Sequence, residues 1–244
     1  MKIPFTLFLT FLLSLSLQAQ EDNSLNILME AGMPDLADSW TMQEYKLAAT
    51  ILVNRIEEGK LDLPHHSKGS ARVIEKLFNP EGYFQYTDTS LTARFKASSE
   101  FQLKISELQK LYVKEFRLQN GKLNYGKEAL LLTTSALYVT EEISGLGAIF
   151  IRQNPDLNEK QKAGLARYQG GVKMVLLGSL MTLFDEVDYY PEEDVCTFAN
   201  HFFSLYSSLE RRLEPSDRQE LKNKIIESKG KVKLDCIKQA LGET

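Results

Sequence analysis

Helical periodicity is the feature of this sequence that most restricts its fold. Apolar residues recur every three or four positions in nearly every segment, and this is the period of an amphipathic α-helix. The clearest case is "TMQEYKLAATILVNRIEEGK", in which Thr41 and Glu44 have the spacing of a capping box and Gly59 marks the end. The apolar face of this helix consists of Tyr45, Ala48, Leu52 and Ile56.

The same pattern predicts helices over 70–79, 91–118, 128–153, 159–187, 191–210, 215–230 and 233–241. The segment 81–90, "EGYFQYTDTS", is the least helical, and it is expected to form either a short β-hairpin or an ordered loop. The fold class is therefore all-α, an antiparallel bundle of about six to eight helices. Residues 21–244 are expected to form one domain, which "QNGKLNYGK" could subdivide into 21–120 and 121–244.

The predicted helices over 128–153 and 159–187 are apolar around most of their circumference, which is typical of central helices. The turn "NPDLNE" should make them antiparallel neighbours. Their glycines would then allow close approach of the backbones: Gly145, Gly147, Gly164, Gly170, Gly171 and Gly178. A transmembrane hairpin is the alternative, but Glu141, Glu142 and Lys173 interrupt its apolar runs.

The N-terminus has the pattern of a secretory signal peptide over residues 1–20. Lys2 supplies the positive charge, 4–17 is uncharged and rich in Leu and Phe, and Ala19 is small. The alternative is an N-terminal membrane anchor, for which the apolar run is short. We therefore expect an exported protein, periplasmic or secreted, without stable membrane insertion after cleavage.

The charge balance disfavours nucleic-acid binding. The chain carries 29 basic and 33 acidic side chains, a formal net charge of −4, and it has no basic cluster. It also lacks the polybasic stripe that holds proteins on anionic membranes.

Only two cysteines are present, Cys196 and Cys236. In an exported protein an even number of cysteines predicts a disulfide. Closing a loop of this length would stabilise the fold by about 4 kcal/mol in the chain-entropy model. Two buried free thiols are the alternative.

The segment "LFDEVDYYPEEDVC", 183–196, is unusually acidic. Glu192, Glu193 and Asp194 follow Pro191 and should occupy the first turn of a helix, where the helix dipole favours negative charge. Asp185, Glu186 and Asp188 end the preceding helix instead, and we expect them to pair with Lys122 and Lys127. A calcium site at these three carboxylates is one alternative, although the EF-hand spacing fails. A partner-binding surface with Tyr189 and Tyr190 as anchors is another.

The three histidines do not form a metal-binding motif. His65 and His66 are adjacent in "LPHHSKG", which is interpreted as a surface loop, and His201 flanks an apolar stripe. Glu141 and Glu142 project about 100° apart on a helix and cannot act as one carboxylate pair. Glu142 is expected to form a partly buried ion pair with Arg167.

Aromatic residues are concentrated in and just before the segment 81–90: Phe78, Tyr83, Phe84 and Tyr86. We interpret Tyr83, Phe84 and Tyr86 as packing over the bundle. The alternative is a partner-binding patch.

No catalytic motif such as G-x-S-x-G, H-E-x-x-H or a P-loop is present, and no cofactor or metal is predicted. The first hypothesis is therefore a non-enzymatic exported protein that binds another protein, as an envelope accessory factor, a secretion or conjugation component, or an immunity-type binder. The second is a ligand-binding or enzymatic bundle with a site in its core near Tyr138, Glu142, Arg167 and Tyr168.

Overall fold

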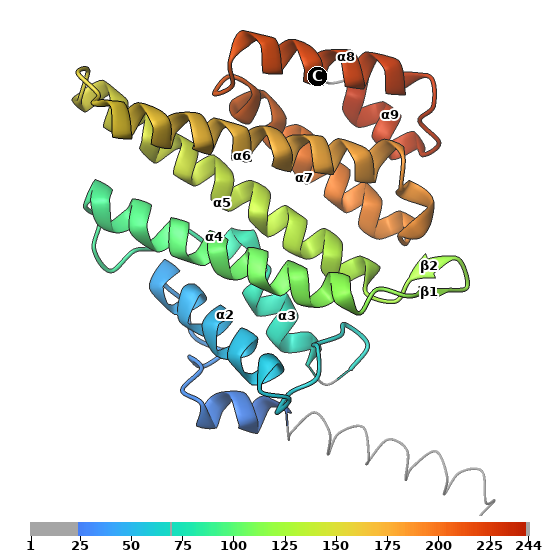
Figure 1. The fold of residues 1–244 in the computed structure, drawn as a ribbon. Helices are drawn as coiled ribbons and strands as arrows, with labels where there is room; N and C mark the ends of the chain where they lie inside the picture. The colour runs from blue at the N-terminus through green and yellow to red at the C-terminus, as the bar shows by residue number, and fades with distance from the viewer. Residues whose placement is uncertain (1–23, 69, 243–244) are drawn as a thin grey trace, which may run out of the picture.

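A computed structural model describes residues 24–68 and 70–242, so the predicted signal peptide lies outside the described residues (Figure 1). A short helix over 24–30 is followed by α2 (Met42–Glu57), α3 (Ala71–Leu77), α4 (Leu91–Lys114), α5 (Gly126–Gln153), α6 (Glu159–Phe184), α7 (Glu192–Glu210), α8 (Pro215–Lys229) and α9 (Asp235–Gly242). Two 3-10 turns, η1 (Pro80–Gly82) and η2 (Val187–Tyr189), lie between them. The predicted all-α fold is confirmed.

The capping box predicted at the start of α2 is present. The Glu44 backbone N–H donates to Thr41 Oγ1 at 3.4 Å, and the Thr41 N–H donates to Glu44 Oε2 at 2.7 Å. These bonds satisfy two of the N–H groups that a helix start leaves unpaired. Gly59 follows the helix with φ +67°, a left-handed conformation that favours glycine.

Helix α5 runs through the middle of the molecule, with α4 and α2 on one side and α7 on the other (Figure 1). It contributes to two hydrophobic cores. The first core joins α5 to α2, α3 and α4, and the α5 residues in it are Leu132, Ala136, Val139 and Ile143. The second core joins α5 to α6, α7, α8 and α9, and the α5 residues in it are Leu130 and Leu137.

The expectation that α6 is a central helix is wrong. Its buried side chains lie in its C-terminal half, and Met174 and Met181 are 74% and 47% exposed. The expected role of the six glycines is also wrong, because an added Cβ at any of them would meet open space. The glycines of α6 therefore leave its surface without side chains at these positions, and no neighbouring helix backbone approaches them closely.

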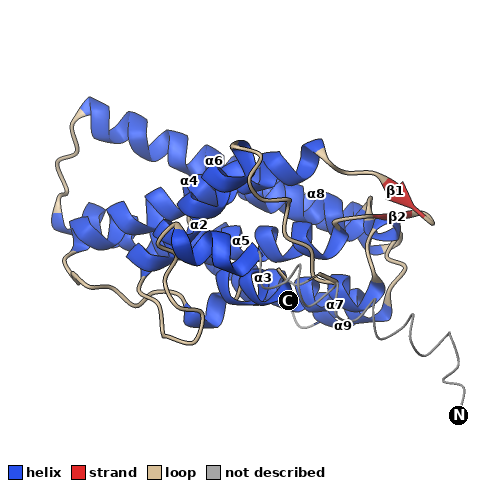
Figure 2. Ribbon diagram, turned by 90° about the horizontal axis from the view of Figure 1, so that it is seen from below, coloured by secondary structure: helices blue, strands red, loops and turns tan. Residues whose placement is uncertain are grey.

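The hairpin lies at 118–123 rather than at 80–90, where η1 and a loop are found. Strands β1 (Leu118–Gln119) and β2 (Lys122–Leu123) pair antiparallel across Asn120 and Gly121, at one end of the bundle (Figure 2). Both turn residues have positive φ, 52° and 79°, as a two-residue Asn-Gly hairpin turn requires. This turn also explains why α4 ends at Lys114, before the predicted Leu118.

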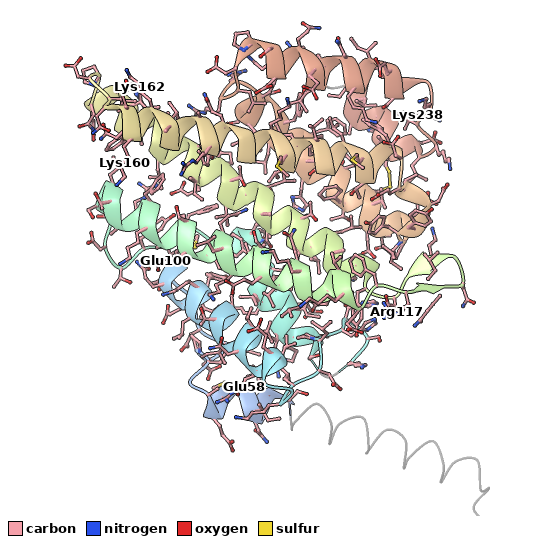
Figure 3. The ribbon with its side chains drawn as sticks, in the orientation of Figure 1. Glu58, Glu100, Arg117, Lys160, Lys162 and Lys238 are labelled. Atoms are coloured by element: carbon pink, nitrogen blue, oxygen red, sulfur yellow. A yellow bond between two sulfur atoms is a disulfide. The ribbon has the colours of Figure 1, made fainter. Side chains whose placement is uncertain are left out.

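Charged side chains of both signs point outward around the molecule, among them Glu58, Glu100, Lys160 and Lys238 (Figure 3). Within 24–68 and 70–242, no helix is both long and apolar enough to cross a membrane.

Cys196 of α7 and Cys236 of α9 lie at disulfide distance, with their Cα atoms 5.6 Å apart. This distance agrees with the predicted Cys196–Cys236 disulfide. The link joins the start of α7 to the last helix, whose Ile237 is fully buried in the second core.

Candidate functional site

A cavity of about 350 Å³ lies between α3, η1, α5 and α7. Apolar side chains from three helices form much of its wall: Ile74, Phe78, Leu130, Leu131 and Phe198. Phe78 and Phe198 are each 1% exposed, so this part of the wall is fixed by the two cores behind it. We call this space the α3–α7 cavity.

The polar side of the α3–α7 cavity carries three carboxylates. Asp194 lies 3.8 Å from Lys127 Nζ, and burial raises the pKa of Asp194 while Lys127 opposes the rise. Glu75 and Glu81 are exposed, and no ion pair joins either of them to another residue that the structure describes. The cavity wall is therefore more negative than positive.

Two histidines also line the α3–α7 cavity. His201 Nδ1 lies 2.9 Å from the Tyr138 hydroxyl, and burial lowers the pKa of His201, with a smaller opposing effect of Glu81. Since the ordinary pKa of histidine is about 6.5, His201 is uncharged at neutral pH. His66 reaches the cavity from the loop before α3.

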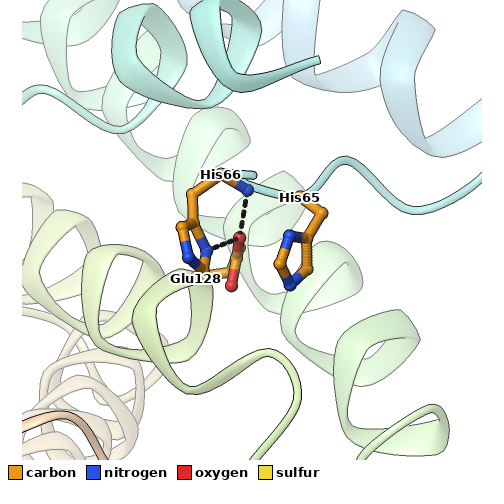
Figure 4. A group of neighbouring side chains, drawn as sticks. All are labelled: His65, His66 and Glu128. Atoms are coloured by element: carbon orange, nitrogen blue, oxygen red, sulfur yellow. Dashed lines mark hydrogen bonds and ion pairs between the residues drawn. The ribbon is translucent and has the colours of Figure 1, made fainter. Parts of the chain in front are cut away.

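His66 is held by Glu128, which lies in the first turn of α5 (Figure 4). The His66 backbone N–H donates to Glu128 Oε1 at 2.6 Å, and His66 Nδ1 lies 2.9 Å from the same oxygen. Both contacts join residues 62 positions apart in the sequence. They fix the loop 65–68 against the start of α5.

Glu128 is a buried acid whose hydrogen bonding is incomplete. Its side chain is 0% exposed, and its Oε2 has no hydrogen-bond partner among the described residues. Leaving a buried polar atom unpaired costs about 1–3 kcal/mol, and more for a charged group. Glu128 is not among the residues predicted from the sequence, because only the fold brings it to the two histidines.

His65 completes the group, and its ring stacks on that of His66 with the centroids 4.4 Å apart. Its Nε2 lies 2.9 Å from the carbonyl oxygen of Asn124, and its Nδ1 accepts from the Ser67 N–H at 3.1 Å. One ligand atom each from His65, His66 and Glu128 lies within 4.8 Å of the others. We call these three residues the histidine–glutamate cluster.

The acidic segment 183–196 divides as predicted, but its lysine partners are different. Asp185 pairs with Lys224 of α8 at 2.8 Å, and Asp188 pairs with Lys233. Glu186, which lies between Asp185 and Asp188 in the sequence, is half-buried. The expected partners have other contacts, since Lys122 donates to the Tyr190 carbonyl and Lys127 faces Asp194. Glu192, Glu193 and Asp194 occupy the first turn of α7, as predicted.

Replacing Asp185 and Asp188 together by asparagine should change the free energy of unfolding by less than about 1 kcal/mol, because their ion pairs are exposed. Millimolar calcium should leave the melting temperature of the wild-type chain unchanged. Thermal unfolding with calcium or with EDTA tests both statements. A calcium-dependent rise that the double variant abolishes would make these carboxylates a cation site.

The four residues expected around a core site do not converge. Glu142 pairs with Arg94 of α4 at 2.7 Å and accepts from the Tyr86 hydroxyl at 2.9 Å. The expected ion pair between Glu142 and Arg167 is therefore wrong, and Arg167 is exposed. Tyr138 faces His201, and the Tyr168 hydroxyl donates to the Thr140 carbonyl. Glu141 has a different neighbour from Glu142 and accepts from Ser208 of α7.

The aromatic residues after η1 pack onto the bundle, as the first interpretation expected. Tyr83 is 5% exposed and its hydroxyl reaches the Leu77 carbonyl, while Phe84 and Tyr86 are half-buried against the first core. In the acidic segment, Tyr190 is 7% exposed and Tyr189 is 45% exposed. Tyr189 is therefore the most exposed of these five residues.

Comparison with known proteins identifies no relative: no family model matches the chain, and neither a curated protein nor a solved structure is significantly similar to it.

Proposed function

We propose that this protein acts by binding, and that its ligand occupies the α3–α7 cavity. The observation that carries the proposal is the cavity itself, which combines an apolar wall with carboxylates at its polar side. Its volume of about 350 Å³ lies within the range of small-molecule sites. The signal-peptide pattern supports an encounter outside the cytoplasm.

The ligand is an apolar group that carries a positive charge. Lys127 and Asp194 largely neutralise each other and His201 is uncharged. This leaves Glu75 and Glu81 as carboxylates with no ion-pair partner among the described residues. An amine or guanidinium group would satisfy them while its apolar part covers Leu131 and Phe198. A free amine and a lysine or arginine side chain of a partner protein share this chemistry, and the second source fits the protein partner expected from the sequence.

Benzylamine, with benzyl alcohol as its uncharged analogue, tests this chemistry. We expect benzylamine to shift the NMR signals of the His66 and His201 rings, and benzyl alcohol to shift them much less at the same concentration. Substituting Thr197, an exposed residue of α7 that lines the cavity, by tryptophan should fill the space and abolish the shifts. Asn200→Trp, at an exposed position of the same helix outside the cavity lining, is the matched control and should bind normally.

Equal shifts with the two probes would overturn the cationic ligand. Binding that persists in Thr197→Trp, or no shift with either probe, would overturn the α3–α7 cavity as the binding site.

A further inference from the structure

We propose that the histidine–glutamate cluster is a binding site for a divalent transition-metal ion of the zinc class. His65, His66 and Glu128 each contribute one ligand atom, and these atoms already lie within 4.8 Å of one another. Figure 4 shows the Glu128 carboxylate beside the two histidines, with both of its hydrogen bonds going to His66. This inference does not depend on the ligand proposed for the α3–α7 cavity.

The unpaired oxygen of Glu128 is the independent observation that points to an ion. Glu128 is 0% exposed, both of its hydrogen bonds reach Oε1, and Oε2 has no partner among the described residues. Buried carboxylates are retained where a charge or a full set of hydrogen bonds compensates them. A bound cation would supply that compensation at the oxygen that lacks it.

The two histidines are held in orientations that suit metal ligation. The Asn124 carbonyl accepts from His65 Nε2, which leaves the lone pair of that neutral ring on Nδ1. Backbone carbonyls commonly fix metal-binding histidines in this way. His66 meets Glu128 through Nδ1, so a metal bound at that nitrogen takes the place of its proton, which in the neutral ring is then carried by Nε2. A metal bound at His65 Nδ1 displaces the two contacts of that nitrogen with Ser67, to the backbone N–H at 3.1 Å and to Oγ at 2.7 Å.

The donor set selects the class of ion. Two imidazole nitrogens and one carboxylate suit zinc and neighbouring transition metals, whereas calcium and magnesium prefer ligand sets made only of oxygen. Three protein ligands leave the fourth position of a tetrahedral zinc ion to water. Because His66 also lines the α3–α7 cavity, the ion would lie at the edge of the space proposed for the ligand.

Competition for Zn²⁺ against a chromophoric chelator tests the site in the processed, untagged protein. We expect one ion per chain, and a Co²⁺ adduct with the visible absorption of a four-coordinate ion. Glu128→Gln keeps the shape of the side chain and removes its charge. It should weaken zinc binding by more than about a hundredfold, the upper end of the effect of losing an outer-shell partner.

His65→Asn and His66→Asn should weaken zinc binding in the same way, with circular dichroism used to verify that each variant is folded. His201→Asn is the matched control, since it removes the remaining histidine of the chain from outside the cluster, and it should bind zinc normally. Thr197→Trp should also keep zinc while it loses benzylamine, which separates the two proposals. No bound ion, several weakly bound ions, or unchanged affinity in Glu128→Gln would overturn the metal site.

Discussion

Replacing Cys196 and Cys236 together by alanine is expected to lower the free energy of unfolding by about 4 kcal/mol. The two residues are 40 positions apart, and their link restricts the unfolded chain over that whole loop. The loop contains most of α7, all of α8 and the start of α9. For a domain of this size the loss corresponds to a fall in melting temperature of roughly 8–16 °C.

Thermal unfolding of the wild-type and double-alanine chains, each with and without reductant, measures this effect. Reductant should destabilise the wild-type chain and leave the double variant unchanged. Equal melting temperatures for the two oxidised chains would show that the disulfide does not stabilise the fold, and two free thiols in protein taken from its own cells would show that it does not form.

Shortening a buried side chain of α5 in either core should destabilise the whole molecule. Leu132 faces the first core and Leu137 faces the second, and both are 0% exposed. Leu132→Ala and Leu137→Ala should each lower the free energy of unfolding by about 2–5 kcal/mol, because each leaves a cavity in a packed core. Since one rigid helix belongs to both cores, each change should shift a single cooperative transition.

Calorimetry distinguishes this behaviour from that of two independent domains. One heat-absorption peak that both variants move to lower temperature supports a single folding unit over 24–242. Two peaks, with Leu132→Ala moving one and Leu137→Ala moving the other, would instead support the subdivision near residue 120. Leu103→Ala on the exposed side of α4 is a suitable control, because that side chain is 63% exposed.

Local patterns in the sequence were sufficient for the existence of helices α2 to α9 and for the capping box of α2, but they did not predict the short helix over 24–30. Thr41, Glu44 and Gly59 lie within one segment of chain, and their chemistry acts over a few residues. Asn120-Gly121 is an equally local hairpin signal, although the prediction given above for this segment is only a break between helices. The position of the hairpin is therefore predictable from the sequence.

Contacts between distant segments were not predictable in the same way. An apolar helix can be central, like α5, or half-exposed, like α6, and composition alone does not distinguish the two. The charge pairing of Asp185 was expected, but Lys224 could be recognised as its partner only after α8 was placed beside α6. Glu128 is the extreme case, because a carboxylate in the first turn of a helix is ordinary until the fold places two histidines beside it.

Native mass spectrometry of the protein released from its own cells tests the binding function most directly. Under non-denaturing conditions, we expect the wild-type chain and Asn200→Trp to carry an additional mass that Thr197→Trp lacks. A small additional mass identifies a free amine, and a second polypeptide identifies a partner that inserts a cationic side chain. The mass of one metal ion is set aside, because the histidine–glutamate cluster would hold it in all three chains. A wild-type chain with no further added mass, or a further mass that Thr197→Trp retains, would contradict binding in the α3–α7 cavity.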